Sequence, residues 1–319
     1  MNAAWLSQRV SEQRTLVLSV LVALLVVAPL LISSVYVLHI MIMTGIYVLL
    51  VLSLNLVLGY SGLLSLATPA FLGMGAYVSA LLSLRLGWDS SLTFLCAVTG
   101  GALPSSLMGI PSLRVSRHSF VIVTLSSTLL LQLLANNWVD LTRGSLGLSG
   151  IPAPRVGSWV IQSKLQWYYL MLGLSAVGIA LVGRMVSSRI GRAMVAARDN
   201  EPLATAIGLD VFRLRLLAFA VSGALAGAAG ACYAHYLTFI DPGVFGFSFS
   251  EALLIMVILG GSGTLWGPVF GAVVFTLLPE LLRVAPEVRS LLYGLLLFFI
   301  VLRMPRGLAS WFGRPEPRA

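Results

Sequence analysis

Charged side chains are scarce in this sequence. Only 10% of its 319 residues are charged, whereas 58% are hydrophobic, and the mean hydropathy is +0.97. Apolar runs of about 20 residues, long enough to cross a bilayer as a helix, recur along the chain. This composition excludes a soluble globular domain and predicts an all-α, polytopic membrane protein.

Lysine, histidine and cysteine are too few or too scattered for the common nucleotide and metal sites. Lys164 is the only lysine and Leu165 follows it, so the sequence has no G-x-x-x-x-G-K-[ST] phosphate loop and the chain is no ATPase by itself. The three histidines are far apart, and both cysteines lie inside apolar runs, which favours packing over a disulfide. We therefore expect neither a metal nor a cofactor in this chain.

Acidic residues are also rare at membrane depth. Of the 11 Asp and Glu residues, only Glu251 and Glu280 fall within apolar segments, and both lie close to segment ends. An intramembrane enzyme would need paired acids or a Ser/His pair, and a proton-driven carrier usually needs buried carboxylates. The scarcity counts against both classes. Sodium coupling through backbone carbonyls stays open, so a stand-alone sodium-coupled transporter is an alternative.

Arginine dominates the net charge of +9 and lies mainly in short loops between apolar runs. This placement fits loops that face anionic lipid, so we expect a lipid membrane and no nucleic acid as partners. The positive-inside rule puts both termini and the arginine-rich segment 185–212 in the cytoplasm.

The apolar segments set the expected number of spans. They lie near residues 15–33, 36–58, 63–84, 91–110, 119–136, 167–184, 213–238, 249–281 and 287–303. The segment 249–281 is too long for one span and contains a glycine-rich stretch at 260–263. We therefore expect broken or re-entrant segments and about eight to ten transmembrane helices.

Two glycine-rich polar stretches interrupt the apolar pattern, one from Leu58 to Ala80 and one from Gly260 to Gly271. At membrane depth, irregular backbone is tolerated only where it is buried in protein or lines a polar cavity. The stretches are therefore candidates for a translocation path, although tightly packed glycines or interfacial turns would leave the same pattern. The candidate path residues are Ser61, Gly62, Ser65, Thr68, Phe71, Gly73, Tyr77, Gly260, Gly261, Ser262 and Gly263.

Two further segments indicate contacts with other elements or chains. In the segment 213–238, Gly223 and Gly227 are four residues apart, which permits close helix approach on one face. We expect this helix to pack against another helix, in this chain or in a second subunit. The loop 137–166 carries aromatic residues, which either anchor at the membrane interface or accompany a contact with an external partner protein.

The segment Ser187–Arg215 is the largest charged island between the apolar runs. Pro202 divides it, Asp199 or Asn200 can cap the second piece, and Gly208 can end that piece. The pattern predicts two short helices at a membrane face, shaped to contact another protein.

Three blocks of the sequence together resemble a known family. They are GYSGLLSLATPAFLGMGAY, then GRAMVAARDNEPLATAIGLDVFRLRLLAFAVSGALAGAAGACYA, then DPGVF with MVILGGSGTLWGPVFGA. They are similar to the membrane permeases of branched-chain amino acid ABC importers, in the LivM-type half of the LivH/LivM pair, and the resemblance covers roughly 58–306. It implies a multi-pass permease of the bacterial inner membrane, with one transmembrane domain over 1–319, a coupling-helix loop at 185–212 and a cytoplasmic tail at 304–319. Related systems carry urea, short amides or other amino acids, so the substrate stays open.

The resemblance also implies partners. These are a second, LivH-type permease subunit, two cytoplasmic ABC ATPases that bind ATP and magnesium, and a periplasmic amino-acid-binding protein. In such importers a short cytoplasmic helix docks on the ATPase; Glu201, Ala204 and Gly208 match E-x-x-A-x-x-x-G, similar to the motif of that helix, whereas Pro202 and Leu203 depart from it. The residues expected to couple to the ATPase are Gly191, Arg192, Ala197, Arg198, Asp199, Asn200, Glu201, Ala204 and Gly208.

Overall fold

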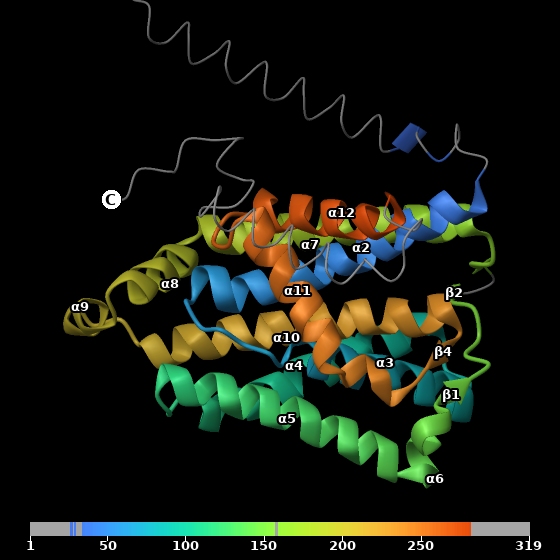
Figure 1. The fold of residues 1–319 in the computed structure, drawn as a ribbon, viewed down its shortest axis with the longest axis horizontal. Coiled ribbons are helices and arrows are strands. Elements are labelled where there is room, and N and C mark those ends of the chain that lie inside the picture. The colour runs from blue at the N-terminus through green and yellow to red at the C-terminus, as the bar shows by residue number, and fades with distance from the viewer. Residues whose placement is uncertain (1–25, 28, 30–33, 157–158, 282–319) are drawn as a thin grey trace, which may run out of the picture.

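The structure is a computed structural model that describes residues 26, 27, 29, 34–156 and 159–281, and its helices lie side by side in a bundle (Figure 1). The predicted segment at 287–303 and the tail at 304–319 lie outside the described residues. The segment at 15–33 contributes only residues 26, 27 and 29.

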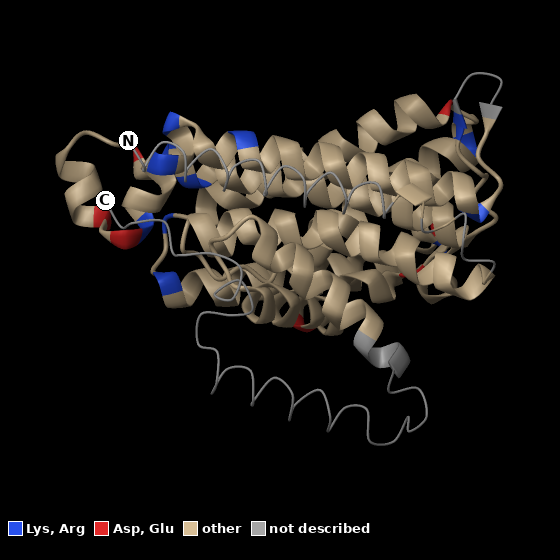
Figure 2. Ribbon diagram, turned by 90° about the horizontal axis from the view of Figure 1, so that it is seen from above, with Lys and Arg blue, Asp and Glu red and all other residues tan. Residues whose placement is uncertain are grey.

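Six helices in the described part are long and apolar enough to cross a membrane, which confirms the all-α polytopic prediction. They are α2 (Val35–Asn55, continued by the π-helical turn η1, Leu56–Tyr60), α3 (Thr68–Leu86), α4 (Ser90–Ser112), α5 (Arg117–Asn137), α7 (Lys164–Ser187) and α10 (Val211–Leu237). Two shorter apolar helices follow, α11 (Phe247–Gly260) and α12 (Trp266–Leu281). Charged residues gather mainly at the two ends of the bundle, with few between them (Figure 2).

The interior of the bundle is formed by α2, α3 and α10. About 61% of the most apolar stretch of α2 and of α3, and 67% of that of α10, is buried, against 28% for α4 and 22% for α5 and α7. The predicted close packing of α10 is confirmed, and its neighbours belong to this chain. A Cβ on Gly227 would overlap the Ala97 carbonyl of α4, and a Cβ on Gly75 of α3 would overlap the Gly227 backbone. The three helices therefore meet backbone to backbone.

Both predicted breaks are present. Residues 61–67 form an extended segment between η1 and α3, and α3 starts at Thr68 with Pro69 in its first turn. This break is shorter than the expected stretch, because residues 68–80 are helical. The long segment 249–281 is broken as expected, between Gly260 and Trp266, with positive φ at Gly261 and Gly263. There α11 and α12 turn back on each other as a tight hairpin (Figure 1).

The charged island forms two short helices that project from one end of the bundle (Figure 1), as predicted. They are α8 (Arg189–Asp199) and α9 (Glu201–Ala206). The Asn200 side chain, rather than that of Asp199, caps α9 by accepting a hydrogen bond from Leu203 N at 3.1 Å. Pro202 occupies the first turn, and Gly208 ends the element with a φ of 86°. We call this end the α8–α9 end.

Short elements cover the opposite end, which we call the loop end. The two-residue strands β1 (Leu148–Ser149) and β4 (Phe239–Ile240) pair antiparallel, and β2 (Arg155–Val156) pairs with β3 (Trp159–Val160). The helical turns are α6 (Val139–Thr142), η2 (Gly144–Leu146) and η3 (Pro242–Phe245). The β1–β4 pair ties the long loop after α5 to the end of α10.

Candidate functional site at the broken helices

The extended segment 61–67 is held by hydroxyl groups of other helices. The Leu66 carbonyl accepts hydrogen bonds from Thr128 of α5 at 3.1 Å and from Ser250 of α11 at 3.0 Å. The Leu66 N–H donates to Thr124 of α5 at 3.3 Å. Backbone without regular structure survives at membrane depth only when its polar groups are satisfied inside the protein. These three side chains form the hydrogen bonds that the Leu66 backbone needs. The sequence pattern does not indicate them.

The second break lies directly against the π-helical turn η1. The buried Asn55 side chain accepts from Gly263 N at 2.9 Å and donates to the Thr264 carbonyl at 2.8 Å. A Cβ on Gly59 would lie 2.9 Å from the Gly263 Cα, so glycine is required at this approach. Asn55 is a lone amide in an apolar run, and that isolation is a signal by which it could have been found.

Arg198 of α8 reaches the same place. Its guanidinium donates to the Gly59 carbonyl at 2.6 Å, and its stem crosses Gly62, where a Cβ would lie 2.5 Å from the arginine Cγ. Its Nη1 lies 2.9 Å from where a Cβ on Gly263 would be. Asn55, Gly59, Gly62, Arg198 and Gly263 thus meet at one point, which we call the Arg198 junction. It joins α8, the first break and the second break.

Glu201 anchors the start of α9 to the bundle. Arg215 of α10 binds both of its carboxylate oxygens, at 2.8 and 2.7 Å, and Arg117 of α5 lies 3.7 Å away. The hydrogen bonds from Arg215 lower the pKa of Glu201, and they outweigh the partial burial that acts in the other direction. The Arg215 side chain is 10% exposed, so this bidentate pair is largely shielded from water. We call these three residues the Glu201 clamp.

The predicted ATPase-coupling residues divide into inward and outward groups. Gly191, Ala197 and Ala204 are buried, and the two alanines pack with Val211 of α10 in a small apolar cluster. Arg198 and Glu201 bond to the bundle, and Asn200 and Gly208 shape α9. Only Arg192 and Asp199 have largely exposed side chains apart from the turn residues.

The outward face of α9 is apolar. Leu203 is 60% exposed and Ile207, one turn later, is 68% exposed. Pro202 and Ala206 are exposed beside them. An apolar patch on a short helix that projects beyond the bundle is typical of a docking surface for another protein.

Most predicted path residues lie inside the bundle. Ser61, Ser65, Thr68, Phe71, Gly73 and Tyr77 are buried, as are Gly260 and Gly261, whereas Ser262 is exposed. Phe71 packs edge-on against Phe219 of α10, and the Tyr77 ring stacks on Phe245 of η3 at 5.8 Å. The Tyr77 hydroxyl is buried without a hydrogen-bond partner among the described residues. These aromatic side chains pack against protein rather than line an open channel.

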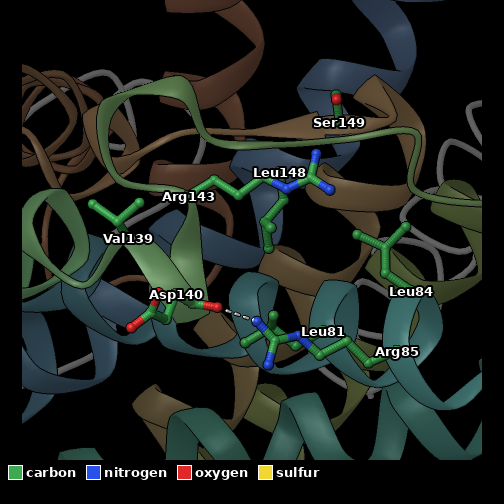
Figure 3. A pocket seen from close by; sticks show the side chains of 8 residues that line it. All are labelled: Leu81, Leu84, Arg85, Val139, Asp140, Arg143, Leu148 and Ser149. Carbon is green, nitrogen blue, oxygen red and sulfur yellow. Dashed lines mark hydrogen bonds between the residues drawn. The ribbon is translucent and has the colours of Figure 1, made fainter.

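The loop end carries a notch of about 430 Å³ (Figure 3). Leu81, Leu84, Val139 and Leu148 give it apolar walls. Its other lining residues are Arg85, Asp140, Arg143 and Ser149. Arg85 is fixed by hydrogen bonds to the carbonyls of Asp140 and Leu141. Arg143 adopts a φ of 60°, a conformation that glycine adopts at less cost.

Comparisons with known proteins agree on one family. The family model for the permease component of branched-chain amino acid transport systems matches residues 36–301. High-affinity branched-chain amino acid transport system permease proteins named LivM are similar to the chain. The one from Salmonella typhimurium is 33% identical over 83% of this chain and 68% of its own length, and the one from Escherichia coli K12 is 32% identical over 90% and 74%. The LivH permease protein of Salmonella typhimurium is 26% identical over 85% of this chain and 92% of its own length. No solved structure matched the chain.

Proposed function

The chain belongs to the branched-chain amino acid transport permease family, and we propose that it is the LivM-type translocation subunit of an ATP-driven importer of hydrophobic, branched-chain amino acids. The match over 36–301, which includes both breaks and the α8–α9 end, is the observation that carries this proposal. The missing phosphate loop fits a subunit whose energy comes from other chains. A stand-alone sodium-coupled transporter is the disfavoured alternative.

We infer that the exposed face of α9 docks on a cytoplasmic ATPase. Leu203 and Ile207 supply the apolar contact, while the Glu201 clamp fixes the helix to the bundle. ATP and magnesium then belong to the ATPase, and this chain itself is not an enzyme. We propose on this basis that the α8–α9 end lies in the cytoplasm of a bacterial inner-membrane protein, and that both termini do so by the positive-inside rule.

The docking surface is tested by a charge placed in the apolar patch. Leu203→Asp should remove the ATPase from the tagged permease during purification, because docking would then bury an unpaired carboxylate in an apolar interface. Thr205→Asp is the matched control, because Thr205 is exposed on the opposite side of the same helix. Retention of the ATPase by the Leu203→Asp protein would overturn the assignment of α9.

We propose that a LivH-type permease completes the complex with two ATPases and a periplasmic binding protein. The exposed apolar side chains of α4, α5 and α7 provide faces for lipid and for a second permease. The mass of the intact complex tests this composition. A particle that contains only copies of this chain would contradict it.

We propose that the binding protein contacts the notch at the loop end. Its two arginines outnumber its one acid, Asp140, so the notch suits a carboxylate side chain of a partner, by charge complementarity. Arg143 has a left-handed backbone conformation, which is costly for a residue with a side chain. An arginine at such a position favours a functional role for its guanidinium. Arg143→Glu should reduce stimulation of ATP hydrolysis by the binding protein about tenfold or more. Arg155→Glu, an exposed arginine on β2 outside the notch, should leave stimulation close to wild type.

We propose that substrate passes beside the extended segment 61–67 and the second break, where backbone polar groups can hold the charged ends of a zwitterion. Most side chains of the predicted path are buried in the structure, so access to them requires the helices around the first break to separate. Uptake of labelled leucine by the reconstituted complex, in competition with urea, short amides and other amino acids, defines the substrate. Uptake driven by a sodium gradient without ATP would support the sodium-coupled alternative.

A further inference from the structure

We propose that Arg198 and Asn55 are positioning residues of the transport cycle, which lock the two broken helices to each other and to α8. The proposal rests on the proposed function, because it takes the ATPase to move α8 and α9. It assigns to Arg198 a role opposite to docking: the side chain holds the bundle rather than the ATPase.

The direction of the Arg198 side chain supports this role. Its guanidinium binds the Gly59 carbonyl at 2.6 Å, and its side chain is 32% exposed. Its second contact is Asp199, the next residue of its own helix, at 3.0 Å. Arg192 on the same helix is exposed, and among the described residues it bonds to the Ser187 carbonyl at the end of α7, the helix that directly precedes α8. Of these two arginines, Arg198 is the one that connects α8 to the first broken helix.

The Gly59 carbonyl needs this partner. The last carbonyls of a helix lack intrahelical donors, and the chain leaves the helical path after Tyr60. Within η1 the hydrogen bonds already shift, with Ser61 N bound to the Leu56 carbonyl and Leu63 N bound to the Val57 carbonyl. A guanidinium at a helix C-terminus satisfies an orphan carbonyl and also faces the negative end of the helix dipole. Arg198 therefore caps the end of the first broken helix.

Asn55 performs the corresponding task on the second break. One amide side chain satisfies both Gly263 N and the Thr264 carbonyl, so the loop between α11 and α12 is fixed to α2. Asn55 is fully buried, and the α2–η1 segment carries it within a membrane-spanning helix. It therefore has no access to an ATPase, and any effect of its substitution on coupling must pass through the junction.

The close fit makes the junction respond as one unit. Glycine at 59, 62 and 263 lets three backbones approach the arginine without side chains between them. A shift of α8 large enough to break the Arg198–Gly59 bond removes the cap of η1, the turn to which Asn55 ties the second break. Interfaces of this kind switch between discrete arrangements rather than deform gradually. Movement of the coupling helices thereby becomes movement of both breaks.

The test measures uptake per ATP hydrolysed in proteoliposomes that contain the whole complex. We expect Arg198→Ala and Asn55→Ala to insert, to retain the ATPase and to hydrolyse ATP, but to lose at least tenfold in leucine transported per ATP. Arg198→Lys keeps the positive charge and one donor nitrogen, so it should recover part of the wild-type leucine transport per ATP. Arg189→Ala removes the same charge from the same helix, at an exposed residue that is not among the expected coupling residues, and should keep the wild-type ratio.

A second perturbation tests the geometry without removing either side chain. A Cβ on Gly263 would lie 2.9 Å from the Arg198 Nη1 and 3.2 Å from the Gly59 carbonyl oxygen, at a φ of 80°. Gly263→Ala should therefore uncouple the complex in the same way as Arg198→Ala. The double variant Arg198→Ala/Gly263→Ala should transport no less leucine per ATP than either single variant, because both substitutions break the same junction.

Failure of this proposal is distinguishable from failure of the proposed function. Wild-type transport per ATP in both Arg198→Ala and Asn55→Ala would overturn the junction, even if Leu203→Asp detaches the ATPase. Loss of the ATPase from the Arg198→Ala complex would also overturn it, because the residue would then act in docking. If Leu203→Asp instead retains the ATPase, the docking assignment fails. The junction is then supported if Asn55→Ala loses leucine transported per ATP and overturned if it does not.

Discussion

Replacing Gly227 by alanine should destabilise the bundle, although alanine normally favours a helix. Gly227 lies where α10 crosses both α3 and α4. A Cβ there would overlap the Ala97 carbonyl and lie 3.1 Å from the Gly101 Cα and N, all of them backbone atoms that no rotamer change can move. Overpacking of this kind costs about 1–3 kcal/mol. The helix-propensity gain of about 1 kcal/mol offsets only part of that cost.

The control for Gly227→Ala is the same substitution at Gly173. Gly173 is exposed on α7, and a Cβ there meets nothing within 4 Å. Gly173→Ala should therefore be neutral or stabilising, and because the propensity gain is common to both variants, they should differ by roughly the overpacking cost, about 1–3 kcal/mol in unfolding free energy. Because membrane proteins often unfold irreversibly, apparent melting midpoints in one detergent at a fixed heating rate are the measure. Equal midpoints for the two variants would refute the three-helix backbone contact.

Three further outcomes are expected from the hydrogen-bonded sites. Glu201→Gln should lower the apparent melting midpoint, because it leaves the largely shielded Arg215 without a charge partner. The cost is about 1–2 kcal/mol, less than for a fully buried pair, because the Glu201 side chain is 40% exposed and water screens it; an unchanged midpoint would contradict the clamp. Since the pKa of Glu201 is lowered on folding, its stabilisation is complete above about pH 5 and disappears as the pH falls through the lowered pKa. The midpoint difference between wild type and Glu201→Gln should thus be flat from pH 8 to 5 and shrink in acid. Thr128→Val and Ser250→Ala should each lower the stability only slightly. The double variant leaves the Leu66 carbonyl without a hydrogen bond and should lose about 1–3 kcal/mol of stability beyond the sum of the single effects. Additive losses would exclude shared bonding to Leu66.

Local signals in the sequence predicted the α8–α9 end well. Capping by an amide, proline in a first turn and glycine after the last turn act within a few residues, so Asn200, Pro202 and Gly208 set these elements without help from the rest of the chain. The glycine spacing of α10 predicted close packing for the same reason, since one face of a helix is determined locally. The partners of that face, α3 and α4, required the structure.

Long-range contacts with backbone atoms were not predictable in this way. The sequence makes Arg198 a candidate for ATPase coupling, because an arginine in a loop has no signature that distinguishes a partner protein from the carbonyl of Gly59, 139 positions away. Phe71 and Tyr77 are candidates for the path because they lie within the glycine-rich stretch Leu58–Ala80. The sequence does not show that their rings pack against Phe219 and Phe245, because those rings come from distant elements.

The hydrogen bonds of the first break also indicate which neighbour it can leave. The Thr128 hydroxyl has one proton and two acceptors in reach, the Leu66 carbonyl at 3.1 Å and the Thr124 carbonyl of its own helix at 2.9 Å. Separation of the extended segment from α5 leaves Thr128 satisfied within its helix, but the Leu66 N–H loses its bond to Thr124 of α5. Separation from α11 keeps both bonds between Leu66 and α5, and among the described hydrogen bonds it removes only the one that Ser250 donates. We therefore expect the extended segment to move with α5 and away from α11, so a disulfide that links the segment to α5 should permit transport and one that links it to α11 should block it.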